Sequence, residues 1–187
     1  MKKIALALIA SLLAFSAFAQ EHLTFKGIPI DGTIYQFSAK LKNAGFSDLK
    51  KDNDGRWYVG QFTGKKCQLL VQYTAVTETV HTVHVFFDDR TQWSLAKSDY
   101  SALKKALTQK YGEPVSREEF ESFYEEDGHE FMHMWDGHVV WQSDFTTDLG
   151  MIYLYIKDQS LSRGCAIIQY IDAANSRKAT NELTNDL

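Results

Sequence analysis

The chain has 187 residues, a formal net charge of -4 at pH 7 and an aromatic share of 13%. A phosphate backbone would repel this excess of Asp and Glu, because affinity for nucleic acid depends on concentrated positive charge. The low proline count and the aromatic content are typical of a folded chain rather than a disordered one. We therefore expect one ordinary folded domain, over residues 20–172, without a nucleic-acid partner.

The first 19 residues have the form of a secretory signal peptide. Lys2 and Lys3 precede a short apolar run, which ends in the small-x-small sequence Ala17-Phe18-Ala19. The run is too short to cross the ~30 Å hydrocarbon core of a membrane. We expect cleavage after Ala19, a periplasmic or secreted location, and no membrane span in the mature chain.

The first predicted element is an amphipathic helix that begins after Thr33. Thr33 and Gln36 form a capping-box pair, and Gly45 supplies the residue at which such a helix ends. Apolar residues recur between them at helical spacing, namely Ile34, Phe37, Leu41 and Ala44.

A second amphipathic helix is predicted from Trp93 to Tyr111, followed by Gly112. The remaining apolar segments predict strands, because they alternate or run apolar between turn residues. These segments are 57–62, 67–73, 80–87, 120–124, 129–135, 138–145, 151–156 and 165–171. The order predicts an α+β fold in which two helices pack on antiparallel meanders, with a repeated plan in halves 20–90 and 91–172. The polar segment 173–187 lacks periodicity, so we expect a flexible tail.

One motif is similar to a catalytic one. His129-Glu130-Phe131-Met132-His133 matches the H-E-x-x-H pattern of zinc peptidases, which needs a helix with both imidazoles on one face. Asp127-Gly128 and Asp136-Gly137 leave only seven residues between two turn signals, which favours a strand. On a strand, Glu130 would point away from both histidines. We therefore interpret the match as accidental and expect neither a metal nor a catalytic residue here.

The same segment predicts a ligand-binding surface. Folded back as a hairpin, residues 129–145 would present aromatic and imidazole side chains on one outer face, which is unusual for a wet surface. The candidate binding residues are His129, Phe131, His133, Trp135, His138 and Asp144. Three alternatives stay open: a further layer covers this face, its histidines are ordinary surface residues, or imidazoles and a carboxylate hold a transition metal.

Cys67 and Cys165 each begin a β-like run, so they can be neighbours in the sheet. In an exported protein such a pair can form a disulfide. The alternative is two buried free thiols that pack as small apolar side chains.

The segments Gly-Ile-Pro-Ile-Asp-Gly-Thr at 27–33 and Leu-Thr-Gln-Lys-Tyr-Gly-Glu-Pro at 107–114 frame the two helices. With the signal peptide, this layout resembles small uncharacterised exported proteins of the Bacteroidetes type. The doubled order of helix and meander also resembles, in architecture, tandem PepSY-like and β-lactamase-inhibitor-like modules. Those folds mostly bind or inhibit, so the resemblance implies binding but transfers no functional residue.

We therefore expect an exported, non-catalytic binding or protein-interaction module without a cofactor, whose ligand is an unknown protein or small molecule. One alternative is an exported hydrolase, with or without a metal, whose site is assembled from residues distant in sequence. Another is an inhibitor-like protein that acts through a sheet face.

Overall fold

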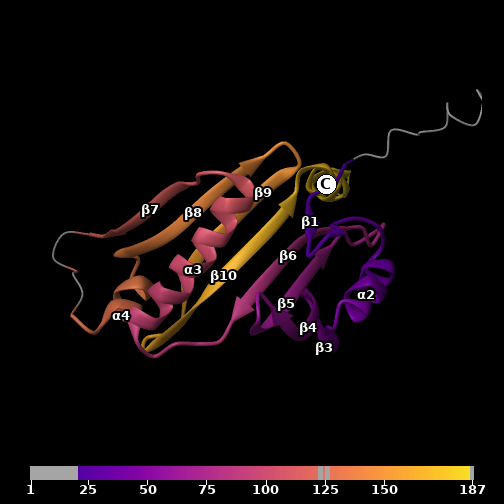
Figure 1. Ribbon diagram of the computed structural model, residues 1–187. Helices are drawn as coiled ribbons and strands as arrows, with labels where there is room; N and C mark the ends of the chain where they lie inside the picture. Colours follow the sequence, from indigo (N-terminus) through magenta and orange to yellow (C-terminus); the bar gives the residue numbers. More distant parts are fainter. Residues whose placement is uncertain (1–20, 122–123, 125–126, 186–187) are drawn as a thin grey trace, which may run out of the picture.

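The structure is a computed structural model that describes residues 21–121, 124 and 127–185. The expected signal peptide lies outside the described residues. The centre of the fold is an eight-stranded sheet with the order β3-β4-β5-β6-β10-β9-β8-β7, in which every neighbouring pair is antiparallel (Figure 1). The strands are β3 (Ser47–Asp52), β4 (Gly55–Phe62), β5 (Lys65–Tyr73), β6 (Val80–Phe87), β7 (Val115–Phe120), β8 (Val139–Thr147), β9 (Gly150–Ser160) and β10 (Arg163–Asp172). A separate two-stranded sheet contains β1 (Thr24–Phe25) and β2 (Ile28–Pro29).

Two of the helices divide this strand order into similar halves. Helix α2 (Ile34–Asn43) precedes β3 to β6, and helix α3 (Trp93–Tyr111) precedes β7 to β10. The last strand of each half, β6 and β10, pair with each other in the middle of the sheet. These findings confirm the α+β class and the antiparallel sheet, while the internal repeat stays a prediction.

Both predicted helices are confirmed, with their ends at the expected signals. At the start of α2, the Gln36 amide N–H donates to Thr33 Oγ1 over 3.4 Å, and the Thr33 amide N–H donates to Gln36 Oε1 over 3.0 Å. At the end of α3, Gly112 adopts a φ of 87°, which is favourable only for glycine.

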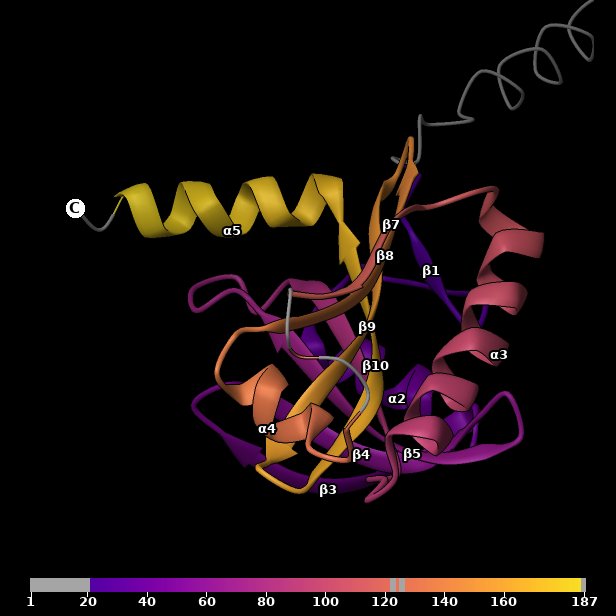
Figure 2. The same cartoon turned by 90° about the vertical axis from the view of Figure 1, so that its left-hand side faces the viewer.

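The hydrophobic core lies between these helices and one face of the sheet. Its fully buried members come from α2, α3 and from alternate positions of the strands. They include Phe37, Leu41, Tyr58, Leu69, Val85, Tyr100 and Leu154. In Figure 2, where the sheet is seen close to edge-on, α3 lies along one side only.

The predicted strand at 129–135 is wrong, because this segment forms the short helix α4 (Glu130–Trp135). The His133 amide N–H donates to the His129 carbonyl over 3.0 Å, which closes a helical turn. Phe131 and Met134 lie on one side of this helix and are buried in the core, three residues apart. The two flanking turn signals therefore enclose a short helix, and the hairpin of residues 129–145 does not form.

The expected flexible tail is also wrong in structure, because residues after 172 form helix α5 (Ala173–Asn185). The carboxylate of Asp172 accepts from the Asn175 amide N–H over 2.8 Å and so caps the first turn. Asn175 Nδ2 then donates to the carbonyls of Ile30 and Val80, each over 3.0 Å. Hydrogen bonds rather than an apolar stripe anchor α5, which projects from the sheet on the side opposite α3 (Figure 2).

Candidate functional site

Neither α2 nor α3 covers the second face of the sheet. Side chains alternate between the two sides of a strand, so a buried residue assigns its neighbours to the other side. Tyr58 is 0% exposed and its hydroxyl bonds Ser38 of α2, which turns Trp57 of β4 away from the helices. We call this second side the open face. It includes Trp57, Gln68, Leu70, His84, Phe86, Gln142, Asp144, Tyr153, Tyr155, Cys165, Ile167 and Gln169.

The strand register arranges these side chains in rows that cross the sheet. In the first row Gln68 pairs with Phe86, Phe86 with Ile167, Ile167 with Tyr155, and Tyr155 with Gln142. Ile167 is only 2% exposed, whereas the two rings beside it are half-buried. In this row, two partly exposed aromatic rings therefore flank one buried aliphatic side chain.

A second row runs beside the first. Trp57 pairs with Leu70, Leu70 with His84, His84 with Gln169, and Gln169 with Tyr153. Asp144 follows on β8, opposite Tyr153. Leu70 is 6% exposed and lies buried between the rings of Trp57 and His84, as Ile167 does between the two rings of the first row.

The rings of the two rows contact each other. The ring centroids of Trp57 and Phe86 lie 5.3 Å apart, and those of His84 and Phe86 lie 6.0 Å apart in a stacked arrangement. These rings belong to β4 and β6, which are two strands apart in the sheet. The open face therefore carries a joined aromatic cluster near its β4 to β6 end.

The centre of the open face is uncharged near neutral pH. Burial, together with the neighbouring imidazole of His81, lowers the pKa of His84 to about 4. His84 Nε2 lies 3.1 Å from Gln72 Oε1, within hydrogen-bonding distance. Burial also raises the pKa of Tyr155. The imidazole and the phenol therefore both present neutral rings to a ligand.

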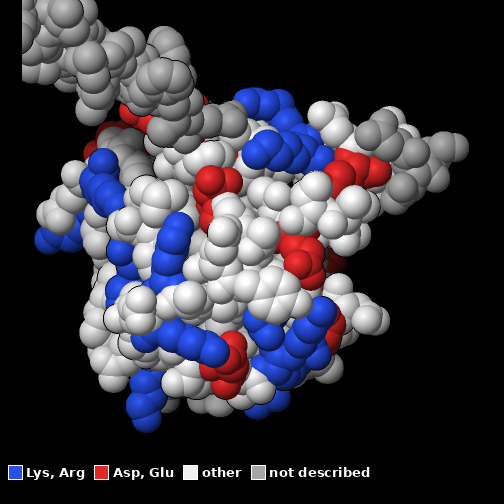
Figure 3. Space-filling model, turned by 90° about the vertical axis from the view of Figure 1, so that its right-hand side faces the viewer, with Lys and Arg blue, Asp and Glu red and all other residues white. Residues whose placement is uncertain are grey.

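Charged side chains lie mainly at the margins of this face. Lys and Arg gather on the side of the molecule formed by α2, β3 and β4 (Figure 3). The edge strand β3 carries Lys50 and Lys51, and the opposite edge strand β7 carries Glu118 and Glu119. Charges at free edges discourage pairing with strands of other chains.

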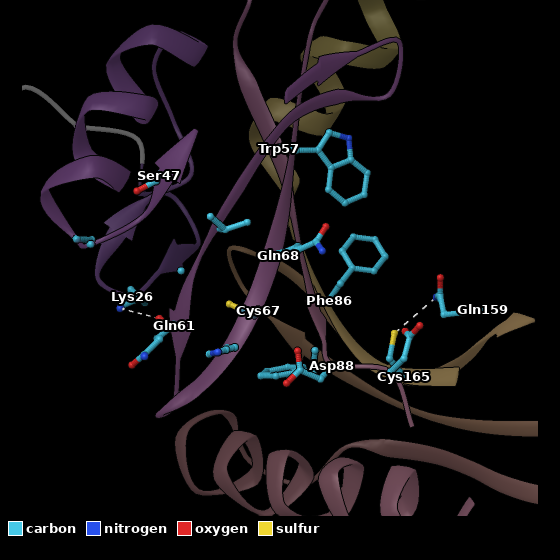
Figure 4. A pocket seen from close by; sticks show the side chains of 17 residues that line it. Lys26, Ser47, Trp57, Gln61, Cys67, Gln68, Phe86, Asp88, Gln159 and Cys165 are labelled. Atoms are coloured by element: carbon cyan, nitrogen blue, oxygen red, sulfur yellow. Dashed lines mark hydrogen bonds between the residues drawn. The ribbon is translucent and has the colours of Figure 1, made fainter. Parts of the chain in front are cut away.

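A groove of about 1090 Å³ lies at the β4 to β6 end of the sheet. Trp57, Gln68, Phe86, Gln159 and Cys165 point into one common space on the open face (Figure 4). The rest of the lining comes from the β1–β2 turn, the end of α2, the start of β3, both sides of the β4–β5 hairpin, and the end of β6 with the chain after it. It includes two lysines and two aspartates, namely Lys26, Lys66, Asp88 and Asp89, so its formal charges cancel.

The two cysteines are free and buried. Cys67 pairs with Phe87 and faces the core, whereas Cys165 is two residues from Ile167, which pairs with Phe86. Since Phe86 and Phe87 point to opposite sides, the two sulfurs lie on opposite faces of the sheet, so the disulfide does not form. Burial raises the pKa of Cys67 to about 11 and that of Cys165 to about 12.

The structure does not bring the six predicted binding residues together. His129, Phe131, His133 and Trp135 lie on or next to α4, and His138 precedes β8. Phe131 is 4% exposed and packs edge-on against Trp93, so it belongs to the core. Among these six residues only Asp144 lies on the open face, where its carboxylate accepts from Gln142 Nε2 over 2.7 Å.

The histidines near α4 are each engaged with a neighbour. The ring of Tyr124 stacks on His138 at 4.0 Å between centroids and meets His133 edge-on at 5.0 Å. His133 Nε2 lies 3.1 Å from an Asp127 carboxylate oxygen, and His138 Nδ1 lies 2.7 Å from Glu121 Oε2.

The peptidase-like motif lies on and next to helix α4, so the strand argument against it does not hold. Helix α4 sets the rings of His129 and His133 6.4 Å apart, but the buried Glu130 carboxylate accepts from the Gly128 amide N–H over 3.2 Å. Within the described residues, no group of three or more His, Cys, Asp and Glu side chains is placed to hold a metal ion.

No protein-family model, curated protein or solved structure matches the chain. The resemblance to exported proteins of the Bacteroidetes type and to PepSY-like or inhibitor-like modules therefore stays a prediction. In the part of the chain that the structure describes, no helix combines the length and the apolar character that crossing a bilayer requires.

Sequence reasoning missed the open face because its rows join residues from both halves of the chain. A signal was present in the alternation of Trp57 and Val59, of His84 and Phe86, and of Tyr153 and Tyr155. Alternation shows that two residues share a side of one strand, but only the strand order shows which strands lie next to each other.

Proposed function

We propose that this protein is an exported, non-catalytic binding module that holds its ligand on the open face of the sheet. The observation that carries the proposal is the pair of rows in which half-buried rings alternate with amide and aliphatic side chains. Aromatic side chains in a contiguous solvent-facing surface are typical of contact sites, since they supply much apolar area with few rotatable bonds.

The size of the face supports a ligand that makes an extended contact. Neighbouring strands lie ~4.8 Å apart and a nine-residue strand is roughly 30 Å long, so eight strands cover on the order of 1,000 Å². A standard protein interface buries about 800 Å² on each partner. Helix α5 projects from this side beside one end of β6, β9 and β10, so the free area is somewhat smaller than that of the whole sheet. The remaining area is still of the order that one partner buries in a macromolecular interface.

The titratable groups of the face favour binding over acid–base catalysis. A general acid or base works best when its pKa lies near the working pH. His84 titrates at about 4, and the pKa of Tyr155 is raised above its ordinary value. Asp144 lies at the margin and is engaged with Gln142.

The test is a thermal-shift screen of the mature protein, residues 20–187, against soluble oligosaccharides, peptides, nucleosides and fatty acids. A ligand of the folded state raises the melting temperature, and the rise grows with the logarithm of ligand concentration over Kd. We expect at least one class to do so with the wild type and with Trp135→Ala, a control in which an exposed tryptophan on α4 is removed. The rise should be lost in Trp57→Ala.

An equal rise with Trp57→Ala would place binding elsewhere on the molecule and contradict the proposal. So would a screen in which no class of compound stabilises the wild type. Circular dichroism and urea unfolding of Trp57→Ala establish that the variant is folded before its binding is compared.

A further inference from the structure

We infer that the ligand of the open face is a neutral polysaccharide or oligosaccharide chain that crosses the strands. Its sugar rings stack on the aromatic side chains and its hydroxyl groups bond the glutamines between them. This inference rests on the proposed function and adds the chemical class of the ligand.

The first argument is the charge of the face. Charged residues occur in the two rows only on the outer strands, as Lys50 opposite Trp57, Arg117 opposite Gln142, and Asp144 on β8. The row positions from β4 to β9 carry uncharged or, in His84, neutral side chains. The lysines and aspartates around the groove cancel formally. An anionic polymer needs a concentration of Lys and Arg, and in this molecule those residues gather on the side formed by α2, β3 and β4 (Figure 3). The open face therefore suits an uncharged ligand.

The second argument is the choice of polar side chain. Gln68, Gln142 and Gln169 occupy row positions beside the rings, and Gln159 points into the groove (Figure 4). An amide side chain offers two donors and one acceptor group at once. A sugar hydroxyl is also both donor and acceptor, so each glutamine can pair with hydroxyls without any formal charge.

The third argument is the spacing of the rings. From His84 to Tyr153 and from Phe86 to Tyr155 the register advances by two strands each time, whereas the Trp57 ring reaches across β5 and lies 5.3 Å from Phe86. Two strand intervals amount to roughly 9.6 Å. Two linked pyranose units span a comparable length, so a chain that crosses from β6 to β9 can stack on one aromatic ring at each end of a disaccharide unit. The apolar faces of pyranose rings complement the flat faces of aromatic side chains.

The position of the site argues against an extended peptide. A peptide that binds a sheet usually adds as a strand at an edge, where free main-chain groups receive it. The open face offers side chains only, since its main-chain groups are paired within the sheet. The two free edges carry charged residues instead of this aromatic pattern.

The experiment measures binding of the mature wild-type protein to neutral hexasaccharides of glucose, xylose, mannose and N-acetylglucosamine by calorimetry. Insoluble polysaccharides are tested by co-sedimentation. We expect at least one neutral chain to bind and Phe86→Ala and Tyr155→Ala each to weaken it about tenfold or more, because each removes one ring contact. Tyr155→Phe keeps the ring and should retain most of the affinity. Tyr35→Ala, which removes an exposed ring on α2, should leave it unchanged.

Several results would overturn the carbohydrate inference and identify what replaces it. If no neutral saccharide binds while another compound class stabilises the protein in a Trp57-dependent way, the ligand class is wrong and the binding face stands. If a sulfated or uronic-acid polymer binds more tightly than every neutral chain, the face does not select neutral ligands. If saccharides bind equally to wild type, Phe86→Ala and Tyr155→Ala, the site lies elsewhere and the proposed function fails with it.

Discussion

The two faces of the same sheet differ in what their side chains do. Leu154 and Tyr155 are consecutive in β9, yet Leu154 is 0% exposed in the core under the helices and Tyr155 lies half-buried on the open face. The helix side is an uninterrupted packing surface, whereas the open side alternates rings, amides and low aliphatic positions. In our proposal, consecutive residues of one strand therefore have different roles: one packs in the core and the next contacts the ligand.

The largest expected effect is on the helix side. Leu154→Ala removes a fully buried side chain and should lower the free energy of unfolding by about 2 to 5 kcal/mol. Tyr155→Ala, its neighbour on the open side, should cost only about 1 kcal/mol, because its ring is half-buried. Urea unfolding followed by circular dichroism measures both. Equal losses would show that the open face is packed as a core and would remove the contrast.

A smaller effect is expected on the pH dependence of the free energy of unfolding. An unfolded histidine binds its proton near pH 6.5, while folded His84 does so near pH 4. Between these values the unfolded state binds more protons, so stability should fall as the pH drops from about 6.5 to about 4. His84→Gln should flatten this slope while keeping a polar partner for Gln72. Urea midpoints at several pH values measure the slope, and an unchanged slope in His84→Gln would show that this imidazole titrates normally.

The smallest difference between the two faces is expected in the reactivity of their cysteine thiols. Cys67 on the helix side and Cys165 on the open side are both buried, and their raised pKa values leave little thiolate at pH 8. A thiol reagent should therefore react slowly with the native protein and with two thiols per chain in urea. Ser162→Cys, at an exposed turn, should add one rapidly reacting thiol as a control. Fewer than two thiols in urea would indicate a bridge and contradict the placement of the sulfurs on opposite faces.

The sequence predicted those parts of the fold that depend on neighbouring residues. Helix α2 follows from the Thr33–Gln36 capping box, and α3 from an apolar stripe that ends at Gly112. Strand β3 was not predicted, because its polar sequence carries no alternation. Helix α4 was taken for a strand since six residues are too few to show a helical period, and α5 was missed because hydrogen bonds from Asp172 and Asn175 replace the usual apolar stripe.

The candidate site was harder to predict than the fold. Asp144 lies on the open face, whereas the other five predicted binding residues lie on or near α4. Phe86 and Tyr155 share a row only because β6 of the first half pairs with β10 of the second. No local sequence pattern predicts the pairing of β6 with β10, because that pairing depends on contacts between two meanders that are distant in sequence.

Hydrogen bonds of the Asp172 carboxylate join the two ends of the described chain. Its fully buried carboxylate accepts from the Leu23 amide N–H over 2.8 Å, and the two residues are 149 positions apart. Asn175 reaches the Ile30 carbonyl in the same region. During synthesis the Leu23 amide therefore has no partner until Asp172 has been made. The β6 edge of the first meander likewise stays unpaired until β10 is available.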